Sequence, residues 1–290
     1  MRPVSWAELD GWSADDHAAA WAAFSLTADA PVAPSDPRAF FEENFDPVEV
    51  VPAGTAHFTG YYEPELPASR QRNAAFSHPL YSTPPGLDLS QPWHARAEIV
   101  AGDLLSGHEI AYVETAIEAF LAQVQGSVRL RLAEGGSLRL GFAAKNGQPY
   151  RSIGAELARR GVAAPITPDV IRRWCAENPG QVQDLLNHNP SFVFFQVLDL
   201  PEDSGPIGAM GQPVTAGRSL AVDPDVIPLG SPVWADCPGR TPRLMVAQDI
   251  GSAIKGPGRG DIFCGTGPEA GAEAGAINDH GRMIWLRRRA

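Results

Sequence analysis

A strand, a glycine-rich loop and a second strand are encoded in residues 244–264, LMVAQDIGSAIKGPGRGDIFC. The apolar start of this stretch predicts a buried strand that carries Asp249 at its end. The loop has four glycines, which let the backbone fold tightly or approach a ligand closely: Gly251, Gly256, Gly258 and Gly260. Asp261 then opens an apolar segment with Ile262 and Phe263. Such neighbours remove water from the Asp261 carboxylate and raise its pKa, as a general acid at neutral pH requires.

The same spacing also fits a purely structural role for both carboxylates. Asp249 can cap a turn, and Asp261 can form a salt bridge with Arg259 or Lys255. Structural ion pairs perturb pKa values as active sites do. Spacing alone therefore leaves both interpretations open.

The composition sets the broad class of the protein. A chain of 290 residues is long enough for one large or two smaller domains. Its formal net charge of −11 gives no electrostatic attraction to nucleic acid, so we expect no nucleic-acid partner. No apolar stretch approaches the roughly 20 residues of a membrane span. We expect no transmembrane segment, and neither a signal peptide nor a lipoprotein cysteine is visible in the chain.

The sequence offers no motif for a metal or an organic cofactor. The seven histidines lack metal-ligand spacing, and no phosphate-binding glycine motif follows a strand and opens a helix. The three cysteines include no C-x-x-C pair, so a zinc site is not expected. Cys237 and Cys264 could pair in an oxidising compartment, although three buried thiols, with Cys175 as the third, are the simpler interpretation. We therefore expect neither metal nor cofactor.

The pattern of apolar residues changes twice along the chain. Helices are predicted after Asp16 and Asp36, and a long Pro-rich connection over residues 64–93. The middle of the chain predicts a helix over 110–124, a hairpin over 128–142 and helices over 153–160, 168–177 and 181–186. From residue 191 onward strands dominate, apart from a helix over 269–277. These changes suggest a β-barrel domain whose sequence is interrupted by the middle segment.

An aromatic motif, FTGYYEP, occupies residues 58–64. Adjacent side chains on a strand point to opposite faces, so either Tyr61 or Tyr62 should be accessible. Aromatic rings with hydroxyl groups suit stacking on a sugar or a base, and a half-buried strand pair is equally compatible with the pattern.

Five motifs in this order resemble the MltA-type family of membrane-bound lytic murein transglycosylases. They lie at residues 58–64, 150–154 (YRSIG), 189–195 (NPSFVFF), 215–223 (TAGRSLAVD) and 248–256 (QDIGSAIKG). The last two form the family's 3D domain, whose three aspartates match Asp223, Asp249 and Asp261 here. The resemblance implies a mainly β fold with some α: a double-psi β-barrel, a smaller β-rich domain inserted into it, and a deep groove between them. It predicts barrel segments at 1–80 and 189–290 and an inserted domain at 81–188.

The resemblance also implies a reaction. Such enzymes cleave the β-1,4 bond between N-acetylmuramic acid and N-acetylglucosamine without water and leave a 1,6-anhydromuramoyl end. By motif position Asp261 is the catalytic acid and base, and Asp249 supports the site. The family acts in cell wall turnover, in the periplasm or at the outer membrane, and we expect a monomer that binds peptidoglycan glycan strands.

The residues expected to contact the glycan come from all five motifs. They are Gly60, Tyr61, Tyr62, Tyr150, Arg151, Ser152, Ser191, Phe192, Phe194, Gln196, Thr215, Arg218, Asp223, Lys255 and Gly256. Two alternatives stay open. The chain could be a glycan-binding module without catalysis, or a hydrolase that uses Asp249 and Asp261 as a pair of carboxylates.

Overall fold

The computed structural model describes residues 1–27, 32–52, 55–88 and 90–289 and divides into two compact units. Unit 1 comprises Met1–Tyr62 and Glu202–Ala290, and unit 2 comprises Glu63–Pro201. Unit 2 is therefore inserted in the sequence of unit 1. The boundaries differ from the positions 80/81 and 188/189 that the sequence suggested. They do so because residues 65–69, 78–81 and 193–198 are strands of the unit 2 sheet.

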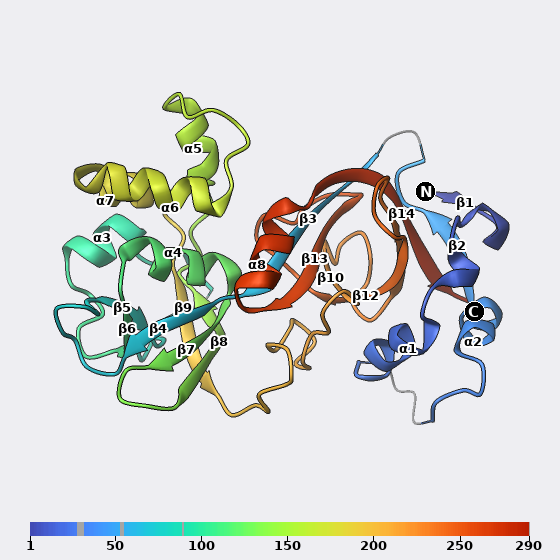
Figure 1. Cartoon of the computed structure of the whole chain (residues 1–290), viewed down its shortest axis with the longest axis horizontal. Helices are drawn as coiled ribbons and strands as arrows, with labels where there is room; N and C mark the ends of the chain where they lie inside the picture. Colours follow the sequence, from blue (N-terminus) through green and yellow to red (C-terminus); the bar gives the residue numbers. More distant parts are fainter. Residues whose placement is uncertain (28–31, 53–54, 89, 290) are drawn as a thin grey trace. The chain divides into compact units, whose positions relative to one another are not determined.

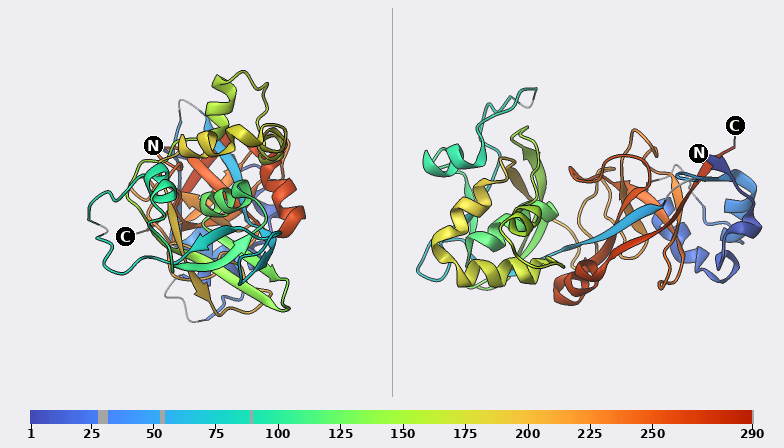
Figure 2. Two further views of the ribbon diagram at one scale, coloured as in Figure 1. Left: turned by 90° about the vertical axis from the view of Figure 1, so that its left-hand side faces the viewer. Right: turned by 90° about the horizontal axis from the view of Figure 1, so that it is seen from above.

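Unit 1 is a barrel with helices added to it (Figure 1). A closed ring is formed in the order β14-β11-β12-β10-β13-β3-β14, and β2 and then β1 extend the sheet beyond β14. The right-hand view of Figure 2 shows both chain termini at the same end of unit 1. The ring consists of β3 (Ala56–Glu63), β10 (Ser219–Val222), β11 (Pro232–Asp236), β12 (Arg243–Asp249), β13 (Arg259–Thr266) and β14 (Asn278–Arg288). The other elements are β1 (Arg2–Pro3), η1 (Trp6–Glu8), η2 (Trp12–Ala14), α1 (His17–Ser25), α2 (Pro37–Asn44), β2 (Phe45–Glu49) and α8 (Gly267–Ala276).

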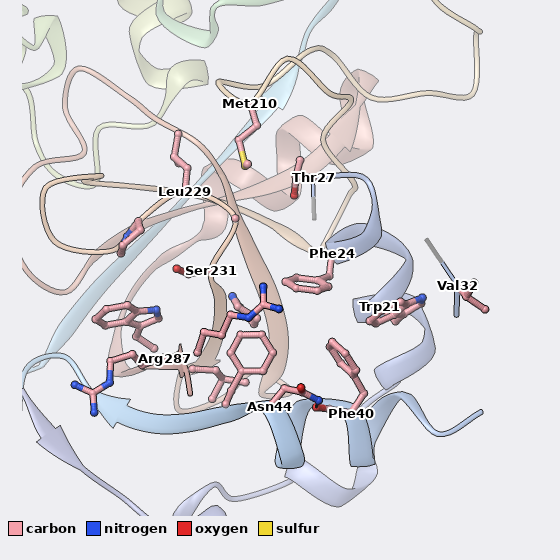
Figure 3. Close-up of a pocket in the computed structure, with 17 residues that line it drawn as sticks. Trp21, Phe24, Thr27, Val32, Phe40, Asn44, Met210, Leu229, Ser231 and Arg287 are labelled. Atoms are coloured by element: carbon pink, nitrogen blue, oxygen red, sulfur yellow. Dashed lines mark hydrogen bonds between the residues drawn. The ribbon is translucent and has the colours of Figure 1, made fainter. Parts of the chain in front are cut away.

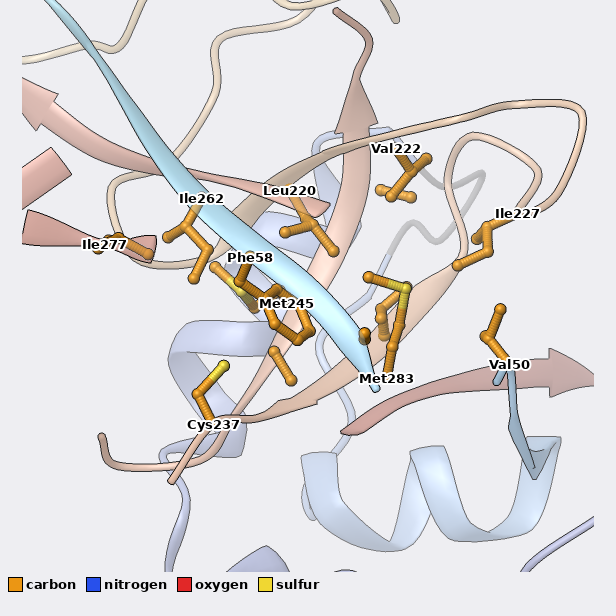
Figure 4. Close-up of a cluster of buried hydrophobic side chains, with 14 residues drawn as sticks. Val50, Phe58, Leu220, Val222, Ile227, Cys237, Met245, Ile262, Ile277 and Met283 are labelled. Carbon is orange, nitrogen blue, oxygen red and sulfur yellow. The ribbon is translucent and has the colours of Figure 1, made fainter. Parts of the chain in front are cut away.

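The barrel interior is filled by apolar side chains from every strand of the ring (Figure 4). Phe58, Leu220, Met245 and Met283 are fully or almost fully buried there. Because side chains alternate along a strand, each residue that points into this core places its neighbours on the outer face of the barrel. The outward-facing residues therefore meet either the packed helices or polar partners on the outer face.

Helices α1 and α2 pack on the outer face of the barrel and bury a second apolar cluster. Asp36 caps α2 as the sequence predicted, and Asp16 is the N-cap of α1. A cavity of about 660 Å³ lies between these helices and the end of β14 (Figure 3). Trp21, Phe24 and Phe40 line it together with residues of β14.

Unit 2 is a six-stranded sheet covered by helices, with strand order β5-β6-β4-β7-β8-β9. Its strands are β4 (Glu65–Ser69), β5 (His78–Tyr81), β6 (Glu109–Val113), β7 (Ser127–Leu132), β8 (Ser137–Lys145) and β9 (Val193–Leu198). Its helices are α3 (Arg96–Ala101), α4 (Ala116–Gln125), α5 (Ile153–Arg159), α6 (Pro168–Glu177), η3 (Pro179–Gln181) and α7 (Val182–Asn187). Helix α4 buries one side against the sheet and the other against α5, α6 and α7.

Two predictions for this unit were wrong. Residues 110–113 lie in β6, not in a helix, because Ala111 and Val113 fill the core of the sheet. Helix α4 begins only after Thr115, whose hydroxyl accepts a hydrogen bond from the Glu118 backbone N–H at 3.2 Å. The Pro-rich stretch is not a connection but contains β4 and β5. A proline is tolerated best in an edge strand such as β5, whereas β4 is an interior strand whose pairing with β6 and β7 overrides its proline content.

A buried ion pair clamps the two points where the chain enters and leaves unit 2. The Arg139 guanidinium donates to Glu63 at 2.8 and 2.9 Å and to the Pro201 carbonyl at 3.0 Å. The Glu63 side chain has no exposed area, and that of Arg139 is 7% exposed. Because Glu63 and Pro201 are the first and last residues of unit 2, one guanidinium fixes both crossings.

Replacement of Glu63 by Ala should destabilise the protein by about 3 kcal/mol. The change leaves the Arg139 charge buried without its carboxylate, which costs about 3–5 kcal/mol in comparable pairs. Urea unfolding of purified variants measures the effect. The matched control is Glu65→Ala, whose partner Arg131 is 67% exposed, and which should cost less than about 1 kcal/mol. Equal losses for the two variants would contradict the clamp.

Candidate active site

Strand β10 brings two carboxylates to either side of one residue. Ala221 pairs with Asp249 on the parallel strand β12 and with Asp261 on the antiparallel strand β13. Neighbouring strands lie about 4.8 Å apart, so the two aspartate Cα atoms are roughly 10 Å apart across β10. Ile262 points into the barrel core, which places Asp261 and Phe263 on the outer face. The sheet thus joins residues that are twelve positions apart in the sequence.

Asp261 is held by a short chain of hydrogen bonds from β3. The Thr59 hydroxyl donates to Asp261 Oδ1 at 2.5 Å. The Thr59 oxygen in turn accepts from Arg259 Nη2 at 2.9 Å. Arg259 Nη1 donates to the carbonyl oxygens of Gly260 and His57 at 2.7 and 3.2 Å. Arg259 therefore acts on Asp261 through Thr59.

Asp249 accepts hydrogen bonds on both of its carboxylate oxygens. The Tyr61 hydroxyl donates to Oδ2 at 2.7 Å, and the backbone N–H groups of Ala209 and Ile250 donate to Oδ1 at 3.1 and 2.9 Å. The loop around Ala209 lies close to β12 because Gly208 has no side chain: a Cβ there would lie 2.7 Å from the Gln248 carbonyl oxygen. Three donors thus orient this carboxylate.

Burial raises the pKa of both aspartates. The pKa of Asp261 rises to about 6, chiefly because burial shields the carboxyl group from water. The Thr59 hydroxyl and the Arg259 charge lower this pKa, and the Asp249 charge raises it. Burial also raises the pKa of Asp249, against the hydrogen bond from Tyr61. The Tyr61 ring lies 5.2 Å from that of Phe263, and the pKa of Tyr61 is well above its usual value because of burial. A carboxyl group with a pKa near 6 can both release and accept a proton near neutral pH.

The third aspartate of the motif set holds a loop in place. Asp223 accepts from the Gly256 backbone N–H at 2.7 Å and from Lys255 Nζ at 3.3 Å. The Gly256 hydrogen bond is the main reason that the pKa of Asp223 is lowered. Asp223 therefore remains ionised and fixes the turn that leads from β12 towards β13.

The other predicted residues of unit 1 have structural partners. Gly60 lies against α8, where a Cβ would be 2.7 Å from Ala274 Cα, and the Tyr62 ring lies close to Gly271 of the same helix. Arg218 donates to Asp15 at 2.9 Å and to the Leu244 carbonyl at 2.8 Å. Thr215 donates its backbone N–H to the Ser219 hydroxyl at 2.8 Å. These residues support the barrel around the two carboxylates.

The remaining predicted residues belong to unit 2. Tyr150 has a raised pKa because of burial, Arg151 is exposed, and the Ser152 hydroxyl caps α5. The Ser191 backbone is fixed by Asn189, and the exposed Gln196 donates to the Phe142 carbonyl at 3.1 Å. They are parts of a separate compact unit from the carboxylates.

Two expectations about aromatic and apolar neighbours need correction. Phe192 and Phe194 are 3% and 0% exposed and pack in a core cluster of unit 2, so their rings present no face to a sugar. Phe192 instead packs against the buried Arg96 guanidinium at 4.9 Å. Ile262 points away from Asp261, so Phe263 is the member of the predicted pair that shares the outer face with it.

The described residues include three free cysteines and neither a metal-binding cluster nor a membrane-spanning helix. Cys175, Cys237 and Cys264 are free thiols. No group of three or more His, Cys, Asp or Glu side chains within the described ranges is placed to hold a metal ion. None of the helices that the structure describes is both long and apolar enough to cross a membrane.

Comparison with known proteins identifies the family. The MltA specific insert domain matches residues 57–196, and the 3D domain matches residues 218–287. Membrane-bound lytic murein transglycosylase A of Escherichia coli K12 is 38% identical over 252 residues, which are 82% of this chain and 67% of that protein. The chain belongs to the MltA family. Its counterpart from Vibrio cholerae is 33% identical over 80% of this chain and 65% of that protein, so the chain spans about two thirds of these relatives.

Solved MltA structures share the fold of the chain. A membrane-bound lytic murein transglycosylase from Agrobacterium tumefaciens superposes with a TM-score of 0.86 at 32% identity, covering 99% of this chain and 97% of that one. Escherichia coli MltA with bound chitohexaose gives a TM-score of 0.76 at 33% identity, covering 97% and 85%. The resemblance seen in the sequence is confirmed, as is a mainly β fold with a closed barrel and a second sheet.

Two polar residues of the MltA-type site were missed among the predicted site residues. Thr59 lies within the first motif and, two positions before Tyr61, shares its face of β3, which strand alternation could have revealed. Arg259 was expected only as a direct salt-bridge partner of Asp261, whereas it bonds to Thr59. The hydrogen bond from Arg259 to Thr59 depends on the pairing of β3 with β13, which no local pattern in the sequence predicts.

The raised pKa of Asp261 makes the stability of the protein depend on pH. The folded protein favours the protonated carboxyl group, so this contribution is complete below the unfolded pKa near 4 and is lost as the pH rises through about 6. Asp261→Asn cannot ionise. We expect it to match the wild type near pH 4 and to be up to about 3 kcal/mol more stable at pH 7. Urea unfolding across this range measures the difference, and a gap that does not change with pH would contradict the shift.

Proposed function

We propose that this chain is a lytic transglycosylase that cleaves the β-1,4 bond between N-acetylmuramic acid and N-acetylglucosamine in peptidoglycan. The product carries a 1,6-anhydromuramoyl end. The observation that carries the proposal is Asp261, a shielded carboxyl group with a pKa near 6 on the barrel of an MltA-family chain. The named activity of the relatives supports the substrate class.

One carboxyl group is sufficient for this reaction because the nucleophile is part of the substrate. Protonated Asp261 gives its proton to the glycosidic oxygen as the bond to the muramoyl C1 breaks. The resulting carboxylate then takes a proton from the C6 hydroxyl, whose oxygen forms the new bond to C1. The attack is intramolecular and gains from proximity. Asp261 ends the cycle protonated, and neither metal nor cofactor enters any step.

Asp249 suits an electrostatic and positioning role better than that of a second catalytic carboxylate. All three of its hydrogen-bond partners donate to it, and donors favour the ionised form. Its negative charge raises the pKa of Asp261 and would also stabilise positive charge that develops at the muramoyl C1. A hydrolase would instead need a carboxylate free to activate water, with reducing ends as products.

Further glycan contacts are proposed at polar residues of both units. Arg151 and Lys255 are exposed cations that can meet the lactyl or peptide carboxylates of the substrate. Tyr150, Ser152 and Gln196 are proposed as unit 2 contacts. The chain acts as a monomer on glycan strands during cell wall turnover, in the periplasm or at the outer membrane, where its relatives are described as membrane-bound.

Replacement of Asp261 by Asn should abolish most activity without loss of folding. General acid–base catalysis contributes about 10²–10⁴-fold, and one group here performs both proton transfers, so we expect a loss at the upper end of this range. Mass spectrometry of anhydromuropeptides released from sacculi, with the melting temperature recorded in parallel, measures the effect. Near wild-type turnover by a folded Asp261→Asn protein would refute the assignment.

Asp249→Asn is the companion variant. An amide in its place keeps the shape but removes the charge that raises the pKa of Asp261, so we expect a smaller loss of activity than for Asp261→Asn. A larger loss in a fully folded protein would reverse the two roles. Reducing ends in place of anhydro ends would indicate a hydrolase, and binding without any product would indicate a glycan-binding module.

Chelation should leave the activity unchanged. Proton transfer from Asp261 and attack by the substrate's own hydroxyl need no metal ion. Digestion of sacculi after treatment with EDTA, compared with untreated enzyme, checks this expectation. A loss that a divalent cation restores would show that the proposed chemistry is incomplete.

A further inference from the structure

The direction of one hydroxyl proton follows from the partners of Thr59. The Thr59 oxygen lies 2.9 Å from Arg259 Nη2 and 2.5 Å from Asp261 Oδ1. A guanidinium has only donors, so it cannot accept a proton from Thr59. The single Thr59 proton therefore points to Asp261, and the lone pair on its oxygen receives the proton of Arg259.

Arg259 is fixed in the position that this direction requires. Its other terminal nitrogen donates to the carbonyl oxygens of Gly260 and His57, which lie on β13 and β3. Burial lowers the pKa of Arg259, but an arginine keeps its proton at neutral pH. The guanidinium is thus a permanent donor that bridges two strands and cannot turn away from Thr59 without breaking these contacts.

We infer that Arg259 and Thr59 are positioning residues that reserve Oδ1 of Asp261 as a hydrogen-bond acceptor and leave Oδ2 as the oxygen that carries the catalytic proton. This inference rests on the proposed function. Oδ2 releases its proton to the glycosidic oxygen as that bond breaks. It takes a proton from the C6 hydroxyl as the C1–O6 bond forms, so the proton count is unchanged over the cycle.

The assignment matters because it leaves one of the two carboxylate oxygens, Oδ2, as the atom that can hold and transfer a proton. A proton on Oδ1 would face the Thr59 proton across a distance of only 2.5 Å between the two oxygens. The Thr59 hydroxyl could avoid this only by turning its proton towards Arg259, but the N–H of Arg259 already points at the Thr59 oxygen. Both arrangements place two protons between one pair of atoms. The arginine thus excludes the alternative site of the proton without touching Asp261.

Other charged or titratable groups act on Asp261 and must be separated from this effect. Arg259 and His57 lower its pKa, and Asp249 raises it. Cys264 lies on the same strand, and its own pKa is raised to about 12, so it stays neutral near pH 7. Tyr61 also stays neutral because its pKa is raised well above 10. The carboxylate Asp249 is therefore the main opposing charge.

Thr59→Val tests the inference because valine keeps the shape and removes the hydroxyl. Loss of a hydrogen bond to a charged group is worth about one to two pH units. We expect the alkaline decline of kcat/KM, where Asp261 loses its proton, to move up by about one pH unit, and kcat to fall about tenfold. Thr59→Ser should restore both, and Arg259→Met should shift the profile in the same direction as Thr59→Val. Arg131→Met, which removes an exposed positive charge from unit 2, is the matched control and should change neither.

A second measurement does not depend on activity. The stability gain of Asp261→Asn over its parent grows above pH 4, and the pH at which this gain levels off reports the pKa of Asp261 in the folded protein. This levelling-off pH should rise when both proteins also carry Thr59→Val. If the gain levelled off at the same pH with Thr59→Val or Arg259→Met present, and the pH–rate profiles were normal, the positioning role would be overturned. If the wild type released no anhydro product, the proposed function would fail. The stability measurement would still show whether the Thr59 hydroxyl lowers the pKa of Asp261.

Discussion

Closure of the barrel around a filled interior is the constraint on which the site depends. Phe58, Leu220 and Ile262 occupy the inside, so the intervening residues of β3, β10 and β13 must face outward. This alternation places Thr59, Ala221 and Asp261 on one outer face. Because Ala221 is a small residue between two carboxylates, β10 separates their strands without a bulky side chain. The geometry of the candidate site is thus a consequence of packing on the opposite side of the same strands.

A second constraint operates where the chain passes between the units. The chain passes between the units at residues 62/63 and 201/202, and each of these points must be held in place for the insert to stay closed at its base. The bidentate pair of Glu63 and Arg139, with the Pro201 carbonyl on the same guanidinium, closes the insert at its base. Arginine suits this task because its planar donors can satisfy a carboxylate and a carbonyl together. The ends of unit 2 are therefore held together by a side-chain ion pair, whereas the barrel of unit 1 is closed by backbone hydrogen bonds between β14 and β3.

The sequence predicted the helices that have strong caps and the hairpin over 128–142, because these depend on local patterns. It also singled out Asp249 and Asp261, which lie on either side of Ala221. It failed where tertiary pairing overrides composition, as in the Pro-rich strands β4 and β5 and in residues 110–113. The aromatic residues Phe192 and Phe194 suggested a sugar-binding surface, but both rings are buried in the apolar core of unit 2. The Arg259–Thr59 contact was not predictable, because it joins residues 200 positions apart through the pairing of strands.

The two carboxylates show how one barrel can give the same side chain two different roles. Both are shielded from water, which raises their pKa values. Asp249 receives three donors, two of them backbone N–H groups that cannot turn away, so its ionised form is held in place. Asp261 receives the Thr59 hydroxyl, whose oxygen is in turn fixed by Arg259. The negative charge of Asp249 adds to the raised pKa of Asp261, and the larger number of donors on Asp249 favours its ionised form.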